Sequence, residues 1–249
     1  MIILKSLREI DRIKRSNVIV VEILEELKKA TKPGITTLEL EDLTKELLIK
    51  KKAQPAFKGY RGYPACLCTS VNEEVVHGIP SNRVLKEGDI LSIDFGVLYD
   101  GYYGDAAITI PVGKVSQEAK KLMDVAEKSL YEGIKMARVG NRLSDISHAI
   151  QVHVEKNNFS VVRDFVGHGI GRELHEAPQI PNYGYPGKGV RLKSGMVLAI
   201  EPMVNIGNWE INILSDGWTA VTRDNSLSAH FEHSVAITDT GAIILSTPS

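Results

Sequence analysis

Four acidic residues stand in stretches of sequence that are otherwise apolar and typical of β-strands. They are Asp94, Asp105, Glu201 and Glu232. An unpaired buried charge is costly, and the strand-like stretches around these acids contain no Lys or Arg. We therefore expect a positive group from elsewhere between the carboxylates, and a divalent cation is the simplest candidate.

Two of the acids flank Asp100-Gly101, a dipeptide typical of two-residue hairpin turns. Such a turn places Asp94 opposite residue 107 and makes Asp105 its diagonal neighbour on the same face of the sheet. Like charges this close destabilise a sheet unless a cation lies between them. Two alternatives stay open: the acids face water at strand edges or turns, or they pair with distant arginines such as Arg163, Arg172 and Arg191.

Histidines are the natural complement to these acids. His168 lies between glycines in Val-Gly-His-Gly-Ile-Gly, which predicts a loop rather than a helix, and His77 and His175 are further functional candidates. His148 and His153 are interpreted as structural. For His230 and His233 two interpretations stay open, namely packing and contact with the metal ligands.

Four carboxylates and one imidazole make a hard, oxygen-rich ligand set. It suits Mn²⁺, Fe²⁺, Co²⁺ or Zn²⁺, and two ions balance four negative charges better than one. Paired ions activate a water molecule and polarise a carbonyl, so hydrolysis of an amide or a phosphoester is the expected chemistry. The other catalytic motifs are missing, namely His-Glu-x-x-His, Gly-x-x-x-x-Gly-Lys and Gly-x-Ser-x-Gly, and the glycines around His168 lack the spacing of a nucleotide-binding loop.

The elements that must position these residues occur in the same order in each half of the chain. Capping boxes predict helices beginning near Ser6 and Thr36, separated by Pro33-Gly34, and amphipathic helices are expected over 116–137 and 144–156. Residues 54–64 are expected to form a loop, and strands are expected over 66–71, 90–98, 102–110, 159–162, 196–200, 210–214, 219–221, 234–238 and 242–245. This order predicts one catalytic domain over 1–249, duplicated as halves of about 6–112 and 114–247.

The composition is that of an ordinary soluble globular protein. Of the 249 residues, 43% are hydrophobic and 24% charged, and 30 Lys and Arg against 31 Asp and Glu give a net charge of −1. This balance argues against DNA binding. The two cysteines, Cys66 and Cys68, are poorly placed for a disulfide, and no apolar run suggests a signal peptide or a membrane span. We expect a cytoplasmic protein.

The candidate residues lie in motifs that closely resemble those of the type I methionine aminopeptidases, in their short bacterial form. The motifs are residues 72–80, Asp94 with 101–105, 167–171, 174–182, 199–203 and 231–233. The resemblance implies an α/β (α+β) fold, the pita-bread fold of creatinases and aminopeptidases, with two pseudo-symmetric α-α-β halves around a curved antiparallel sheet. It also implies removal of the initiator methionine from nascent proteins when the second residue is small.

The same resemblance implies a role for each matching residue. Two divalent ions (Co, Mn, Fe or Zn) would be held by Asp94, Asp105, His168, Glu201 and Glu232. Asp105 and Glu232 would bind both ions, His168 and Glu201 one ion, and Asp94 the other. His77 would lie near the leaving amide, His175 would donate to the scissile carbonyl, and Glu201 would also take a proton from the attacking water.

The resemblance further implies an apolar slot for the methionine side chain. The slot would be formed by Phe57, Tyr60, Tyr63, Cys68, Leu174 and Trp218, and His77 and His175 would complete the substrate-binding residues. Some family members have Cys at the position of Phe57 and an aromatic residue at that of Leu174, so the tolerance of this pocket for other long side chains is an open question.

The expected partners are nascent polypeptides that begin with Met, with neither a membrane nor DNA, and the protein is expected to be a monomer. The basic first helix and the lysines at 50–52 suggest a transient ribosome contact, although a solvated helix face explains them more simply. Two rival functions stay open. An X-Pro peptidase shares the fold and the ligands, and a non-catalytic binding module is the rival from another class, against which the complete ligand set argues.

Overall fold

Both predicted capping boxes are formed, and each begins a helix of the first half. The Ser6 hydroxyl accepts from the backbone N–H of Glu9 while the Glu9 carboxylate accepts from that of Ser6, and Thr36 and Glu39 form the same pair. These bonds satisfy N–H groups that a helix start leaves unpaired. In the computed structural model, which describes residues 1–247, the helices are α1 (Leu7–Ala30), α2 (Thr37–Lys51), α3 (Gln117–Met136), α4 (Leu143–Lys156) and the short 3₁₀ helix η1 (Tyr60–Gly62).

Most strands form one antiparallel sheet, in the order β1–β4–β5–β14–β9–β7–β8, with β2 also beside β4 and β15 beside β14. Their bounds are β1 (Gln54–Pro55), β2 (Leu67–Val71), β4 (Ile90–Tyr99), β5 (Tyr102–Pro111), β7 (Val166–Gly169), β8 (Glu176–Pro181), β9 (Val197–Ile200), β14 (Glu232–Thr238) and β15 (Gly241–Ile244). Two small sheets join β13 (Ser228–His230), β10 (Met203–Asn205) and β6 (Ser160–Val161), and β11 (Ile211–Ile213), β12 (Ala220–Thr222) and β3 (Glu74–Val76).

The predicted turn at Asp100 and Gly101 sets the register of the longest strand pair. Both residues have positive φ angles, 49° and 76°, as expected of a two-residue hairpin turn. β4 and β5 pair along their whole length, with Asp94 opposite Ala107. The register predicted from the sequence is therefore confirmed.

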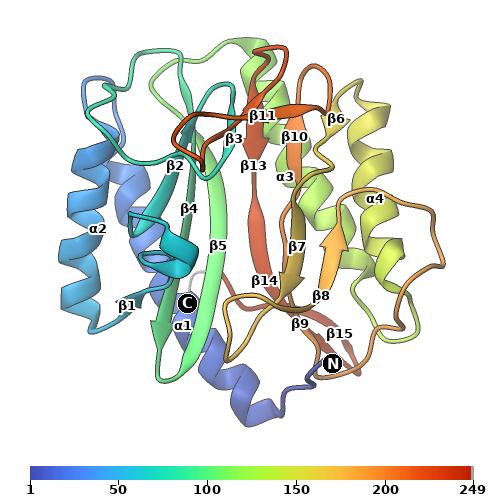
Figure 1. The fold of residues 1–249 in the computed structure, drawn as a ribbon. Helices are drawn as coiled ribbons and strands as arrows, with labels where there is room; N and C mark the ends of the chain where they lie inside the picture. Colours follow the sequence, from blue (N-terminus) through green and yellow to red (C-terminus); the bar gives the residue numbers. More distant parts are fainter. Residues whose placement is uncertain (248–249) are drawn as a thin grey trace.

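Each pair of helices covers one end of the large sheet. Figure 1 shows α1 and α2 beside β4 and β5, and α3 and α4 on the side of β7, β8 and β9. A buried apolar cluster lies under each pair, one including Leu24 and Phe95 and the other including Leu122 and Leu198. Burial of these side chains fixes the helices to the sheet. No helix within residues 1–247 is long and apolar enough to cross a membrane.

The predicted helices and strands are all present, with small shifts at their ends. The strands β3, β7, β8, β10 and β13 were not predicted, and the expected loop at 54–64 contains both β1 and η1. The two cysteines are buried and free, as expected. The last two residues of the predicted domain, 248 and 249, lie outside the described residues, and the duplication into halves stays a prediction.

Candidate metal centre

The register of three neighbouring strands brings three of the predicted acids together. Asp94 on β4 and Glu232 on β14 both pair with Ala107, which lies between them on β5. Asp105 lies two residues before Ala107, so its side chain points to the same face of the sheet. Strands from both halves of the chain therefore contribute to one cluster.

The remaining two predicted ligands come from the adjoining strands. His168 on β7 pairs with Ala199 on β9, and Glu201 follows two residues after Ala199, directly beyond the end of β9. The alternation of side chains along a strand puts both on one face. The structure thus brings together all five residues that the sequence predicted as metal ligands.

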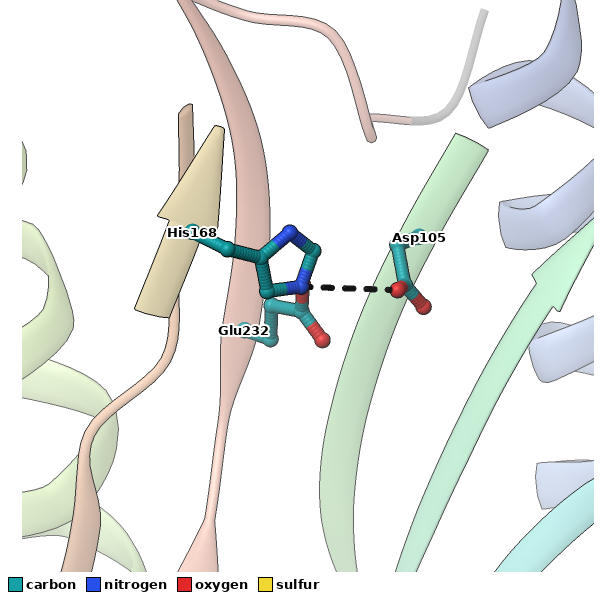
Figure 2. A group of neighbouring side chains, drawn as sticks. All are labelled: Asp105, His168 and Glu232. Carbon is teal, nitrogen blue, oxygen red and sulfur yellow. Dashed lines mark ion pairs between the residues drawn. The ribbon is translucent and has the colours of Figure 1, made fainter. Parts of the chain in front are cut away.

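The distances within the cluster are those of a candidate metal site. Asp105, His168 and Glu232 each offer one ligand atom, and these atoms lie within 4.8 Å of one another. Figure 2 shows the three side chains pointing toward a common centre from β5, β7 and β14. Nε2 of His168 also lies 3.4 Å from Oε1 of Glu201. Asp105, His168 and Glu232 are only 3%, 6% and 2% exposed, so these side chains are almost completely buried.

Burial of so many acids has a clear electrostatic consequence. It raises the pKa of Asp94 to about 7. For Asp105, Glu201 and Glu232, burial and then repulsion from the neighbouring carboxylates raise the pKa well above its ordinary value. Burial lowers the pKa of His168 to about 4, so its imidazole is neutral at pH 7 and is able to act as a ligand. The neutral ring therefore does not compensate the negative charge of the carboxylates.

Protein groups do not supply the missing positive charge within residues 1–247. Oδ1 of Asp94, Oδ1 of Asp105 and Oε1 of Glu232 are buried without a hydrogen-bond partner there. The arginines considered as partners lie elsewhere: Arg163 over the rings of Tyr183 and Trp209, Arg172 beside Glu9, and Arg191 in a backbone β-bridge with Arg142. The arginine alternative is therefore wrong, and the donor set fits a hard divalent cation.

The expectation that His168 lies in a loop is wrong. The residue is part of β7, between β8 and β9, and Gln179 lies opposite it on β8. The flanking glycines serve close approach of these strands. A Cβ on Gly167 would lie 2.4 Å from the carbonyl oxygen of Ala199, which is too close for any side chain.

A cavity of about 360 Å³ opens beside the cluster. All eight predicted substrate-binding residues line it together with the five candidate ligands: Phe57, Tyr60, Tyr63, Cys68, His77, Leu174, His175 and Trp218. Further lining residues were not predicted: Arg61, Val76, Asp164, Phe165, Val166, Gln179 and Met203. Of these, Gln179 reaches the cavity because it lies opposite His168 on β8, a pairing that no local sequence pattern indicates.

His175 and His77 occupy different parts of this cavity wall. The ring of His175 lies beside that of His168, with centroids 4.2 Å apart, and its Nδ1 lies 2.7 Å from the Tyr60 hydroxyl. His77 has a positive φ of 62° and packs edge-on against Phe165, with centroids 5.1 Å apart. Burial lowers the pKa of His175 to about 3 and also lowers that of His77.

The two histidines that flank Glu232 in sequence have different environments. Nε2 of His230 lies 3.9 Å from Oε2 of Glu201, whereas the ring of His233 binds the hydroxyls of Ser246 and Tyr131. His230 therefore contacts a candidate metal ligand, whereas His233 has a packing role. Asn182 also contacts a candidate ligand, which was not predicted: its side-chain amide donates a hydrogen bond to the backbone carbonyl of Glu201.

Comparison with known proteins gives one consistent result. The model of metallopeptidase family M24 matches residues 11–239. Methionine aminopeptidase 1 of Bacillus subtilis is 56% identical over 245 residues, which cover 98% of this chain and 99% of the relative. Methionine aminopeptidase of Clostridium acetobutylicum is 54% identical over 246 residues, which cover 98% of both.

Solved structures agree on the fold. The crystal structure of methionine aminopeptidase from Thermotoga maritima matches with a TM-score of 0.97 and 52% identity, over 99% of this chain and 100% of that chain. Prolidase from Pyrococcus furiosus matches with a TM-score of 0.81 at 22% identity, over 99% of this chain but 66% of that chain, and so shows the fold alone. The predicted pita-bread fold, with its curved antiparallel sheet and helices, is confirmed.

Proposed function

The chain belongs to metallopeptidase family M24 and, within it, to the methionine aminopeptidases, and from this premise we propose how its residues remove an N-terminal methionine. It is a metal-dependent hydrolase that acts on protein N-termini beginning with Met. The observation that carries the proposal is the buried cluster of four carboxylates and one neutral imidazole beside a cavity lined by aromatic residues.

We assign the cluster to two divalent ions, which fits Co²⁺, Mn²⁺, Fe²⁺ or Zn²⁺. Asp105 and Glu232 would bind both ions, His168 and Glu201 one of them, and Asp94 the other. Within residues 1–247, one oxygen each of Asp94, Asp105 and Glu232 has no hydrogen-bond partner. These oxygens support the assignment because each has a lone pair available for a cation. When bound, the ions would supply Lewis-acid activation of a water molecule and of the scissile carbonyl.

His175 is proposed as the hydrogen-bond donor to the scissile carbonyl oxygen. When the Tyr60 hydroxyl donates to Nδ1 across their 2.7 Å separation, the neutral ring carries its proton on Nε2. That N–H then stabilises the negative charge that develops on the oxygen in the transition state. His77, on another part of the cavity wall, is assigned to the nitrogen of the leaving amide.

Glu201 is proposed to carry the proton as well as to bind metal. Its carboxylate would accept the proton of the attacking water and pass it to the nitrogen of the leaving peptide. A general base must lie within reach of the proton that it accepts, and Glu201 lines the cavity together with the other four candidate ligands.

The methionine side chain is assigned to the apolar part of the cavity. Aromatic edges and the Cys68 thiol give a polarisable lining suited to a thioether, and Tyr63 packs edge-on against Trp218 with centroids 5.1 Å apart. His77 packs against both Phe165 and Trp218. We infer that the packed rings of this wall favour a small second residue in the substrate.

The proposal is tested by release of the N-terminal residue from Met-Ala-Ser, Leu-Ala-Ser and Ala-Pro-Ser. Metal-stripped protein is refilled with Co²⁺, Mn²⁺ or Fe²⁺. We expect metal-dependent release from Met-Ala-Ser, little from Leu-Ala-Ser and none by the Asp105→Asn variant. Cleavage of Ala-Pro-Ser instead would indicate an X-Pro peptidase, and no cleavage of any peptide would favour a non-catalytic module.

We further propose that the protein works as a cytoplasmic monomer and touches the ribosome transiently. Only charge supports the ribosome contact: Lys50 and Lys52 are exposed at the end of α2, whereas Lys51 is bound to Glu22 at 2.6 Å. Charge reversal of all three lysines is expected to reduce co-sedimentation with ribosomes. Unchanged co-sedimentation would support an ordinary solvated helix end.

A further inference from the structure

The loop that carries His175 is tied to the N-terminal segment by a buried ion pair. Glu176, the next residue after His175, pairs through Oε2 with the ammonium group of Lys5. The two side chains are only 3% and 6% exposed. Desolvation of a buried ion pair costs free energy unless further hydrogen bonds satisfy its atoms. The groups that form these bonds therefore show which segments the pair holds together.

The other oxygen of Glu176 holds the backbone of its own loop. Oε1 accepts the N–H of Arg172 at 2.9 Å and that of Glu173 at 3.4 Å. The loop is tied to the sheet by the N–H of Tyr103, which donates to the carbonyl of Gly171 at 2.8 Å. One carboxylate thus joins residues 172–176 to Lys5.

Lys5 is itself fixed in place. Its backbone N–H donates to the carbonyl of Gly195 at 2.7 Å, and its ammonium group also donates to the carbonyl of Ile3 at 3.0 Å. A Cβ on Gly171 would lie 2.5 Å from Cε of Lys5 and 2.7 Å from Oε1 of Glu176, so a side chain at this position would displace the ends of both side chains of the pair. Figure 1 shows the N-terminal segment running from the lower end of α1 toward β15.

We propose that Lys5 and Glu176 are positioning residues for His175, an inference that rests on the role proposed for His175. Nδ1 of its ring is hydrogen-bonded to Tyr60, and the ring stacks obliquely beside His168. Because the ring is attached to the loop, a shift of the loop backbone would change the direction in which Nε2 points. Misplacement of a catalytic group by about 1 Å lowers a rate roughly a hundredfold.

The test uses steady-state kinetics of the metal-loaded, full-length enzyme with Met-Ala-Ser. Lys5→Met leaves the Glu176 carboxylate unpaired and is expected to lower kcat roughly 10- to 100-fold with little change in KM. Glu176→Gln is expected to act in the same direction, and it carries the test if Lys5→Met does not fold. Lys5→Arg keeps the pair and should restore most of kcat. Lys29→Met removes an exposed pair with Glu26, formed at 2.7 Å, and serves as the matched control with unchanged kcat.

Combination with His175→Ala separates positioning from general damage. If the pair acts through His175, adding Lys5→Met to His175→Ala lowers kcat no further. A full additional loss in that background, or unchanged kcat in both single variants of the pair, would overturn the inference. If His175→Ala alone leaves kcat unchanged, the role proposed for His175 fails first and the positioning role falls with it.

Discussion

Tyr60 contributes two separable groups to the cavity, a ring on its wall and a hydroxyl on His175. Tyr60→Phe removes only the hydroxyl. A hydrogen bond of this kind contributes about 0.5–1.5 kcal/mol, so we expect kcat for Met-Ala-Ser to fall roughly 2- to 10-fold, with KM unchanged because the ring remains. Steady-state kinetics of the metal-loaded variant checks this. A raised KM with unchanged kcat would instead place the hydroxyl against the methionine side chain.

Asp94 is the only proposed ligand that belongs to the second ion alone, because Asp105 and Glu232 would bind both ions. Loss of a group that only supports a metal ligand weakens binding about 10- to 100-fold, and loss of a ligand should cost at least as much. Asp94→Asn should therefore weaken one of two binding events in calorimetric titration with Mn²⁺ by at least about tenfold. Asp105→Asn should weaken both. A single binding event in the unmodified protein would contradict the two-ion assignment.

At the level of residues, the sequence was informative where the local surroundings of a side chain were unusual. The four acids were predicted as a cluster because each stands in an apolar strand, and the turn at Asp100 added their register. His230 and His233 stayed unresolved, although the alternation of side chains beyond Glu232 points His233 to the opposite face. Gln179 and Asn182 were missed because their contacts depend on pairings between distant segments.

At the level of elements, local signals were predicted well and distant pairings were not. The helix starts at Ser6 and Thr36 depend on bonds within four residues, so they can be predicted from the sequence. β8 was missed because its two prolines argue against a strand, and β7 was missed because a strand with glycines at alternate positions has no apolar pattern of its own. Its stability comes from β9, whose residues lie nearly thirty positions further along the chain.

Glu9 connects an element start with the sheet, and it predicts a pH dependence. Its carboxylate accepts from the backbone of Ser6 and from the Tyr102 hydroxyl, at 2.9 Å, and these bonds lower its pKa to about 2, with the Ser6 backbone bond as the largest cause. A depressed carboxyl pKa stabilises the fold above the unfolded value near 4, and this stability is lost as the pH falls toward 2.

We therefore expect Glu9→Gln to lower Tm at pH 6 and the difference from the unmodified protein to vanish as the pH approaches 2. Thermal denaturation of metal-free protein measures this without interference from metal release. Glu39→Gln removes the charge from the capping pair of α2, in which no tyrosine bond is present, and should show a smaller difference. A difference that grows as the pH falls would contradict the assigned sign.

At the scale of the whole molecule, the acid cluster lies where the two parts of the large sheet meet. β4 and β5 contribute Asp94 and Asp105, while Glu232 begins β14, and β14 pairs with β5 through Glu232 and His233 only. Once ionised, the four carboxylates therefore repel one another across a short strand junction. A bound cation would convert this repulsion into attraction and strengthen the junction itself.

This arrangement predicts opposite pH dependences for the metal-free and the metal-loaded protein. A carboxyl group of the unfolded chain loses its proton near pH 4, whereas Asp94 in the fold keeps its proton up to about pH 7. Between these values the folded, metal-free protein binds more protons than the unfolded chain, so its free energy of unfolding decreases as the pH rises. Metal binding requires deprotonated carboxylates and becomes stronger over the same range.

Thermal denaturation at pH 5 and pH 7.5, after chelation and after refilling with Mn²⁺, measures both effects. A hundredfold excess of metal over its Kd should add about 2.7 kcal/mol, which corresponds to a rise in Tm of roughly 5–10 °C at pH 7.5. The rise should be smaller at pH 5, and Asp105→Asn should reduce it at both values while making the metal-free protein less sensitive to pH. Because the repulsion and the metal affinity arise from the same four carboxylates, the two changes must occur together. A variant that lost one without the other would show that the acids do not form a single shared site.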